Sequence, residues 1–246
     1  MKDMNSKHKK IWRLGLLAVV IMFASCDDAT ISPSSTVTTE EIAIEDFSSI
    51  SVSDAFDVEV FYSDEQYVLI ESNENLHEFI EAYQKEGELV IGVEGGIDIS
   101  GRTILKARVY TNNPIGYISV RGASRLTATD VIYKEDVTFD LTGASFLRTQ
   151  IATENIIANI QGASNLELRG SATSIQLEIG GSSRMQDADM EVSMADVKLS
   201  GASSAEIVIT DEIRLNASGA SVLRYAGDAR IKTIDLTSGS TIEKIN

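Results

Sequence analysis

The second half of the chain repeats one pattern of apolar and polar positions about every 20 residues. Each copy centres on a short Gly-x-Ser phrase, most often Gly-Ala-Ser. Apolar side chains stand two and four residues before each glycine and four residues after it, and the positions between them are mostly polar or charged. Alternation with a period of two predicts β-strands that bury one face.

The repeated phrase keeps a glycine and a serine two residues later in six copies. These residues are Gly122 and Ser124, Gly143 and Ser145, Gly162 and Ser164, Gly181 and Ser183, Gly201 and Ser203, and Gly219 and Ser221. The steps between the glycines are 21, 19, 19, 20 and 18 residues. In a seventh, less regular copy, Ser238 takes the glycine position. A fixed period near 20 residues is typical of solenoid proteins.

One unit of this length is too small to bury its apolar face, but stacked units bury it continuously. We therefore predict an all-β fold, a parallel β-solenoid whose coils rise by about 4.8 Å each, the spacing of paired strands. Parallel winding of this kind is expected to be right-handed. The glycine either sits at a corner that requires a positive φ or points inward where the coil is too narrow for a β-carbon. The serines are expected to face inward and stack as a ladder of hydroxyls.

The section over 41–116 is less regular than the repeats. Its strands are predicted at 56–61, 67–72, 88–93 and 104–110. One short helix is expected over 73–83, because apolar and aromatic residues from Leu76 to Tyr83 recur at helical spacing. We expect this section to form the first coils and to cap the N-terminal end of the rod, since an open end would expose unpaired backbone groups.

The repeats fill 117–246, and we predict one continuous domain over 41–246. The last copy is degraded, with Thr237 and Ser238 where a hydrophobic residue and a glycine are expected. Terminal repeats of solenoids are usually atypical because they cap the stack, so this copy is expected to close the C-terminal end.

The first 25 residues have the layout of a secretory signal, with a basic start, an apolar run and small residues before Cys26. The tetrad F-A-S-C resembles the bacterial lipobox, in which the cysteine becomes the new N-terminus and carries lipid. An ordinary signal peptide with an incidental cysteine is the alternative. We predict a signal peptide over 1–25, lipidation of Cys26 and a flexible polar tether over 26–40. The membrane partner is then the outer membrane of a Gram-negative cell, and the acidic pair Asp27 and Asp28 leaves its side open.

The chain carries 37 acidic and 21 basic residues, a net charge of −16. A surface of this sign repels phosphate backbones, so nucleic-acid binding is not expected. Cys26 is the only cysteine, and a disulfide within one chain is therefore excluded. The fold must be stabilised by its stacked core.

The sequence predicts no catalytic, cofactor-binding or metal-ligating residue and no cofactor, because it contains no H-E-x-x-H, P-loop, G-x-S-x-G or C-x-x-C motif. His77 is expected to have a packing or surface role on the predicted helix. The ladder serines have no histidine near them, and a nucleophilic serine needs an adjacent base. The nearest approach to an acidic cluster is formed by Asp187, Asp189 and Asp196, and a metal would require such ligands to converge.

Two outward columns of the predicted coils mix charges of both signs. The column five residues after each glycine contains Thr127, Arg148, Glu167, Gln186, Glu206 and Arg224. The column three residues before it contains Ser119, Asp140, Asn159, Glu178, Lys198 and Asn216. Such columns are typical of solvated faces with weak pairing between coils.

The start D-A-F-D-V-E-V (54–60) and coils of the type I-Q-G-A-S-N-L-E-L (160–168) resemble the bacterial auto-transporter adhesin head GIN domain family. The similarity covers roughly 47–230. The resemblance implies a right-handed single-stranded β-helix in a surface or periplasmic protein, and it carries no catalytic residues.

Three functions follow as hypotheses. The first is a lipid-anchored, non-enzymatic envelope or surface protein that adheres through a glycan or protein ligand. The second is an envelope scaffold or signalling component that self-associates as a homo-oligomer. The third is a polysaccharide-active β-helix enzyme, which would need clustered carboxylates such as Asp187 and Asp189.

Overall fold

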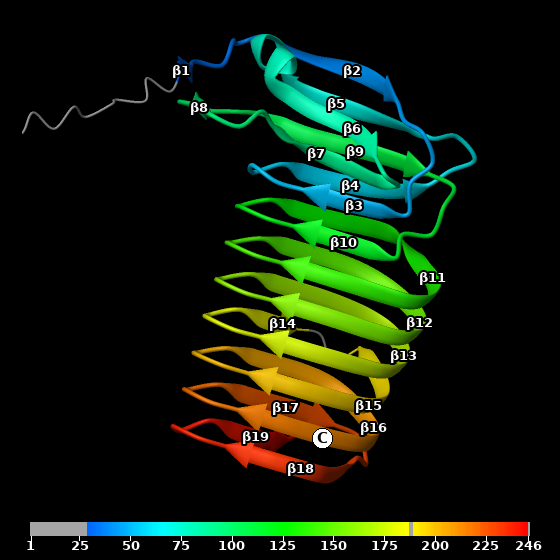
Figure 1. Ribbon diagram of the computed structural model, residues 1–246, viewed down its shortest axis with the longest axis vertical. Helices are drawn as coiled ribbons and strands as arrows, with labels where there is room; N and C mark the ends of the chain where they lie inside the picture. The colour runs from blue at the N-terminus through cyan, green and yellow to red at the C-terminus, as the bar shows by residue number, and fades with distance from the viewer. Residues whose placement is uncertain (1–28, 187–188, 246) are drawn as a thin grey trace, which may run out of the picture.

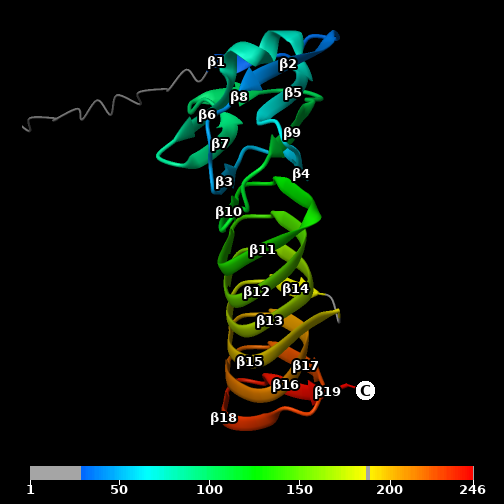
Figure 2. The ribbon, with the colours of Figure 1, turned by 90° about the vertical axis from the view of Figure 1, so that its right-hand side faces the viewer.

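The repeat section winds into a rod, and the segments before it form a broader head at one end (Figures 1 and 2). The computed structural model describes residues 29–186 and 189–245. The predicted signal segment over 1–25, Cys26 and Asp187 lie outside the described residues. About seven turns of a β-solenoid account for most of the described chain, and the predicted fold class is confirmed.

Each coil begins at a Gly-x-Ser turn, crosses one face, rounds a corner and returns across the opposite face (Figure 1). The strands of the coils are β10 (Tyr117–Val120), β11 (Arg125–Leu141), β12 (Phe146–Ile160), β13 (Asn165–Ile179), β14 (Arg184–Gln186), β15 (Met190–Leu199), β16 (Ser204–Ala217), β17 (Val222–Ala226), β18 (Arg230–Leu236) and β19 (Thr241–Lys244). We call the face directly after each turn the first face and the face directly before it the second face. Pairing between successive coils is parallel, and the winding is right-handed.

The interior of the rod is filled by the apolar columns that the sequence pattern predicts. The column two residues before the glycine runs in register through Val120, Leu141, Ile160, Ile179, Leu199 and Ala217. All six are buried, with at most 2% of each exposed. One apolar core extends from Phe47 to Tyr225, so each coil contributes the buried surface that it could not obtain alone.

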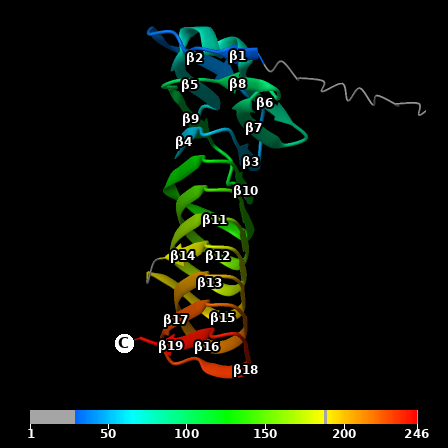
Figure 3. The ribbon, with the colours of Figure 1, turned by 90° about the vertical axis from the view of Figure 1, so that its left-hand side faces the viewer.

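The repeat glycines sit at turns that form one narrow edge of the rod, which faces the viewer in Figure 3. Their φ angles lie between +70° and +86°, a region that residues with a β-carbon rarely adopt. The turns also stack closely: Ala144 N donates to Gly122 O at 2.7 Å, and a β-carbon on Gly143 would lie 2.6 Å from that same oxygen. Of the two explanations left open by the sequence, the corner that requires a positive φ is therefore the one that the structure supports.

The head combines one further coil with antiparallel strands. β3 (Ser49–Val52) and β4 (Asp57–Tyr62) stack directly on β10 and β11. The chain then continues through β5 (Tyr67–Asn73), η1 (Glu74–Phe79), β6 (Ile80–Lys85), β7 (Glu88–Val93), β8 (Ile97–Ile99) and β9 (Leu105–Thr111). β7 and β9 pair parallel with β3 and β4, whereas β6 and β5 pair antiparallel with β7 and β9. β2 (Val37–Ala43), antiparallel to β5, completes the first face.

The predicted helix over 73–83 is shorter than expected and of a different type. Residues 74–79 form the 3-10 helix η1, in which Leu76 is fully buried, and β6 begins at Ile80. The segment I-E-A-Y-Q-K also alternates with a period of two, and it forms six paired positions with β7. Tyr83 therefore lies opposite Val90 in a sheet, because pairing with β7 outweighs the local helical spacing.

The prediction of a flexible tether over 26–40 is wrong for residues 29–40, which the structure describes. β1 (Ala29–Ile31) pairs with β8, and β2 begins at Val37. The turn between them is fixed by side chains of the head, since Asn73 Nδ2 donates to Ser34 O at 2.8 Å and Asn75 Nδ2 donates to Ser32 O at 2.9 Å. These partners are far away in sequence, so local composition alone suggested flexibility.

The C-terminal end, which we call the tail, is not capped by any described residue. β18 pairs only with β16, and β19 pairs only with β17, within the described chain. All seven residues of β18 are exposed. The expectation that the degraded last copy closes the rod is therefore wrong, because a changed sequence in the final coil does not by itself place a segment across its edge.

Candidate functional site

The predicted repeat serines lie inside the turn edge of the rod. Ser124, Ser145, Ser164, Ser183, Ser203 and Ser221 are each at most 2% exposed. Ser145 Oγ lies 2.8 Å from both Val120 O and Thr142 O, and 3.2 Å from Ser164 Oγ. A hydroxyl held by carbonyl acceptors and by its neighbour satisfies the turn backbone, and this contact set contains no base that would activate it.

His77, Asp189 and Asp196 lie on different parts of the molecule and do not form a cluster. His77 Nε2 lies 3.3 Å from Thr38 O, and Nδ1 lies 3.6 Å from a Glu40 carboxylate oxygen, so this ring packs the helix against β2. Asp189 lies at a corner, where Oδ2 is 4.0 Å from Arg169 Nε. Asp196 lies on the second face in register with Arg214. Within the described residues no three His, Cys, Asp or Glu side chains gather closely enough to hold a metal.

The outward columns have the register that the repeat predicts. On the first face, Arg148 Nη2 lies 2.5 Å from Glu167 Oε2, and Arg224 Nε lies 3.0 Å from Glu243 Oε2. On the second face, Asn159 Nδ2 donates to Asp140 Oδ1 at 2.7 Å. These pairs join successive coils, and the exposed ion pairs among them contribute little stability each.

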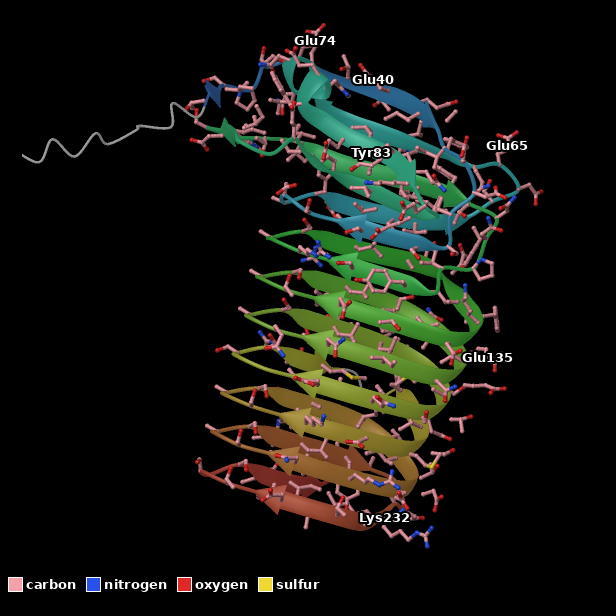
Figure 4. The ribbon with its side chains drawn as sticks, viewed as in Figure 1. Glu40, Glu65, Glu74, Tyr83, Glu135 and Lys232 are labelled. Carbon is pink, nitrogen blue, oxygen red and sulfur yellow. The ribbon has the colours of Figure 1, made fainter. Side chains whose placement is uncertain are left out.

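The candidate site is a hollow of about 500 Å³ at the corner between the head and the rod. It is lined by Tyr62, Asn112, Pro114, Asp130, Val131 and Tyr133. Glu65, three residues after Tyr62, and Glu135, two residues after Tyr133, lie on the same side of the molecule (Figure 4). The lining residues are separated by up to 71 positions in the sequence. They come from β4, from β11 and from the segment that follows β9, and the stacking of β9 and β11 on β4 brings them together.

Two hydrogen bonds join the corner of β11 to the head at this hollow. Tyr62 N donates to Asp130 Oδ2 at 3.0 Å, and Thr129 Oγ1 donates to Val60 O at 3.2 Å. On neighbouring strands of the head, the ring of Tyr110 stacks on Phe61 and Tyr67, with centroid distances of 5.3 and 4.5 Å. These stacked rings join β4, β5 and β9 of the head.

The hydroxyl of Tyr62 is buried and has no hydrogen-bond partner among the described residues. Burial raises the pKa of Tyr62. The nearby backbone of Ile115 lowers this pKa in part, and the negative charge of Asp130 raises it further. Tyr62 therefore stays protonated at neutral pH. A buried hydroxyl without a partner is uncommon in folded proteins, and this one belongs to a residue that lines the hollow.

Tyr133 stands clear of the rod beside the hollow. Its side chain is 69% exposed, and the positions in register on the next two coils are Ala152 and Ser171. Small residues below it leave the face of the ring uncovered. The sequence signal was thus an aromatic residue in an outward column, followed by small residues on the next two coils, and no motif accompanies it.

An aromatic ring beside a carboxylate and an amide suits a ligand that has both apolar C–H faces and hydroxyl groups. The ring of Tyr133 offers a stacking surface, and Asp130 and Asn112 offer acceptors and donors. The groups that line the hollow thus offer a stacking surface and hydrogen-bonding groups to a ligand.

The comparisons with known proteins bear on the fold that carries this hollow. Residues 46–229 match the family described as "Putative auto-transporter adhesin, head GIN domain". The chain belongs to this family. The head GIN match runs from just before β3 to just before β18, and it therefore includes every residue of the hollow. The resemblance predicted from the sequence is confirmed.

Three solved structures share the fold. A putative adhesin from Bacteroides fragilis is 16% identical with a TM-score of 0.81, and the alignment covers 87% of this chain and 100% of that one. A putative adhesin from Parabacteroides merdae is 17% identical with a TM-score of 0.72, covering 88% and 99%. A protein from Parabacteroides distasonis described as a putative lipid binding protein is 17% identical with a TM-score of 0.71, covering 88% and 100%.

Identities this low support the shared architecture alone. No curated protein matches the chain. Among the described residues of this head GIN protein, no helix is long and apolar enough to cross a membrane.

Proposed function

We propose that this protein is a non-enzymatic, lipid-anchored component of the Gram-negative outer membrane that binds neutral glycans in the hollow between Tyr62 and Tyr133. The observation that carries the proposal is the exposed ring of Tyr133 beside Asp130 and Asn112. An exposed aromatic residue that no packing requires, at the edge of a shaped hollow, is typical of a ligand site. Membership of an adhesin family supports a role in adhesion.

Charge favours neutral sugars over acidic ones. Residues 29–116 contain 17 acidic and 4 basic side chains, a balance of −13. The hollow adjoins this acidic region, and Asp130 is one of the residues that line the hollow. Uronic or sulfated sugars would meet like charge there, whereas neutral hydroxyls can donate to a carboxylate.

The anchor is proposed on the lipobox ending at Cys26, from which acyl chains would hold the protein at the membrane. Replacement of Cys26 by serine should move the protein from the membrane fraction to the soluble fraction. Digestion of intact cells with added protease then distinguishes a surface-exposed domain from a periplasmic one. A variant that stayed in the membrane fraction would count against the anchor, and it would leave the glycan proposal standing.

The glycan proposal is tested with the full chain purified in detergent. An array of neutral and acidic oligosaccharides should show binding confined to neutral members, and Tyr133→Ala should weaken that binding at least tenfold. Tyr83→Ala is the matched control, because Tyr83 is also exposed, at 42%, but lies on β6 of the head (Figure 4). Absence of any bound neutral glycan, or equal binding by both variants, would overturn the proposal.

A further inference from the structure

The last coil of the rod leaves its inward-facing residues in solvent. Ile231 and Ile234 are in register with Ile213 and Leu215 of the coil before. Ile213 and Leu215 are 0% and 3% exposed, whereas Ile231 and Ile234 are 42% and 48% exposed. In earlier coils the inward apolar residues are covered by the next coil. At the tail no described coil follows, so these residues stay uncovered. Leu236, in register with the buried Ala217, is 38% exposed.

The backbone edge at the tail is open on both faces. β18 ends the second face and β19 ends the first, and neither has a partner on its outer side among the described residues. Open strand edges with exposed apolar residues are sites of strand addition. Basic side chains can blunt such edges, but Arg230 and Lys232 point back to Asp211 and Glu212 of the previous coil, at 3.2 Å in each pair.

The charge distribution selects a second copy of the same end as the partner. Residues 227–246 contain three acidic and three basic side chains, a balance of zero, on a chain of net charge −16. Two tails can therefore approach without the repulsion that separates two heads or two sides. The head offers a poorer surface for a tail, because its edge strand β2 carries two glutamates and its only large exposed apolar residue is Val37.

We propose that two copies associate tail to tail about a two-fold axis that is perpendicular both to the rod and to its two faces. Such an axis places β18 antiparallel to the partner's β18 and β19 antiparallel to the partner's β19, so that both faces continue through the interface. The isologous contact closes at two copies, because each copy presents a single open end with an apolar surface. The exposed Ile231, Ile234 and Leu236 become core residues of the pair.

The geometry has a consequence for adhesion, which rests on the proposed anchor. Tail-to-tail pairing puts the two heads, each of which begins at β1, at opposite ends of a double-length rod. Two anchored copies can then join two membranes. Vesicles that carry the lipidated protein should cluster, and vesicles that carry Ile231→Lys should not.

The interface itself is tested by sedimentation equilibrium of the full chain in density-matched detergent, with no glycan present. The protein should sediment as a monomer–dimer mixture. Ile231→Lys should raise the dimer dissociation constant at least tenfold, and Ile234→Lys provides an independent second variant. The matched control is Ile157→Lys, because Ile157 is also 42% exposed but lies in the middle of the rod on β12.

Thermal melting of each variant checks that it is folded, which the exposure of all three positions leads us to expect. A chain that is monomeric at every accessible concentration would overturn the proposal, and so would longer oligomers. Equal effects of Ile231→Lys and Ile157→Lys would also overturn it. Because no sugar takes part, these outcomes are independent of those of the glycan experiment.

Discussion

At the head, antiparallel strands and a 3-10 helix cover the first parallel coils, whereas at the tail the final coil faces solvent. The edge strand β2 has the sequence V-T-T-E-E-I-A, and its only large exposed apolar residue is Val37. The edge strand β18 has the sequence R-I-K-T-I-D-L, and three of its seven residues are exposed Ile or Leu side chains. One end is thus closed and charged, and the other is open and apolar.

The difference shows how a solenoid end is closed. At the head the chain leaves the parallel path, crosses the end through η1 and returns in antiparallel strands, so that Leu76 becomes fully buried. At the tail the sequence of the last turn changes, but the path does not. Only a change of path brings new side chains over the exposed core, which explains why a degraded repeat alone leaves the end open.

The largest difference in the free energy of unfolding is expected between two leucine-to-alanine variants, one at each end of the rod. Leu76→Ala removes a side chain that is 0% exposed in the cap, whereas Leu236→Ala removes one that is 38% exposed at the tail. A buried leucine replaced by alanine typically costs about 2–5 kcal/mol, and the tail variant should cost less than about 1 kcal/mol. Urea unfolding followed by circular dichroism measures both. Equal losses would mean that the head is no better packed than the tail.

Two glycines with nearly the same φ separate backbone strain from coil stacking. Gly143 has φ +83° and Gly239 has φ +85°, but a β-carbon would lie 2.6 Å from Gly122 O in the first case and 3.8 Å from Gly219 O in the second. Gly239→Ala should cost about 1–2 kcal/mol through conformation alone. Gly143→Ala should cost a further 1–3 kcal/mol or so, because the stacked turn must shift. A tail variant as destabilised as the mid-rod variant would contradict this account of the turns.

Two ladder serines with similar burial should respond differently to the loss of their hydroxyl groups. Ser145 is 2% exposed and has three oxygen neighbours, whereas the Oγ of Ser124, which is 1% exposed, has no partner. Ser145→Ala should cost about 1 kcal/mol, and Ser124→Ala should be near neutral. Chemical denaturation of the two variants against the wild type gives the comparison. A loss at Ser124 that matches the loss at Ser145 would show that burial alone sets the effect.

The smallest effect concerns alkaline pH and the coils next to the head. Burial raises the pKa of Tyr117 above 10.0, and its hydrogen bond to Asp140 adds to the rise. Burial also raises the pKa of Tyr62. A raised folded pKa stabilises the protein fully below the unfolded value, and this contribution is lost as pH rises through the folded pKa. The urea midpoint should therefore fall above about pH 10, and it should fall less in Tyr117→Phe.

The sequence predicts those features that depend on neighbours one coil away. The positive φ of Gly143, the inward Ser145 and the Arg148–Glu167 pair all follow from a period near 20, because the period itself defines the spatial neighbour. Features that depend on other neighbours were missed. The pairing of β2 with β5 replaced the expected tether, and pairing with β7 shortened the helix.

The candidate site belongs to the second group. Tyr62, Asn112 and Asp130 have no shared motif and no common spacing, and they meet only because the chain leaves the stack after β4 and returns after β9. The open tail was also invisible, since a degraded repeat has the same sequence whether or not a segment covers it. The repeat period therefore does not predict where the chain leaves the stacked coils or which residues meet there.

Hydrogen exchange of backbone amides, measured by mass spectrometry at low and high protein concentration, tests the contrast between the two ends most directly. At low concentration the amides of β18 and β19 should exchange fastest among the strands of the rod, and those of β7 and β9 should be protected. At high concentration protection should rise in β18 and β19 and stay unchanged in β2 and β6. Protection of the tail that is independent of concentration, or a rise at the head instead, would contradict the account.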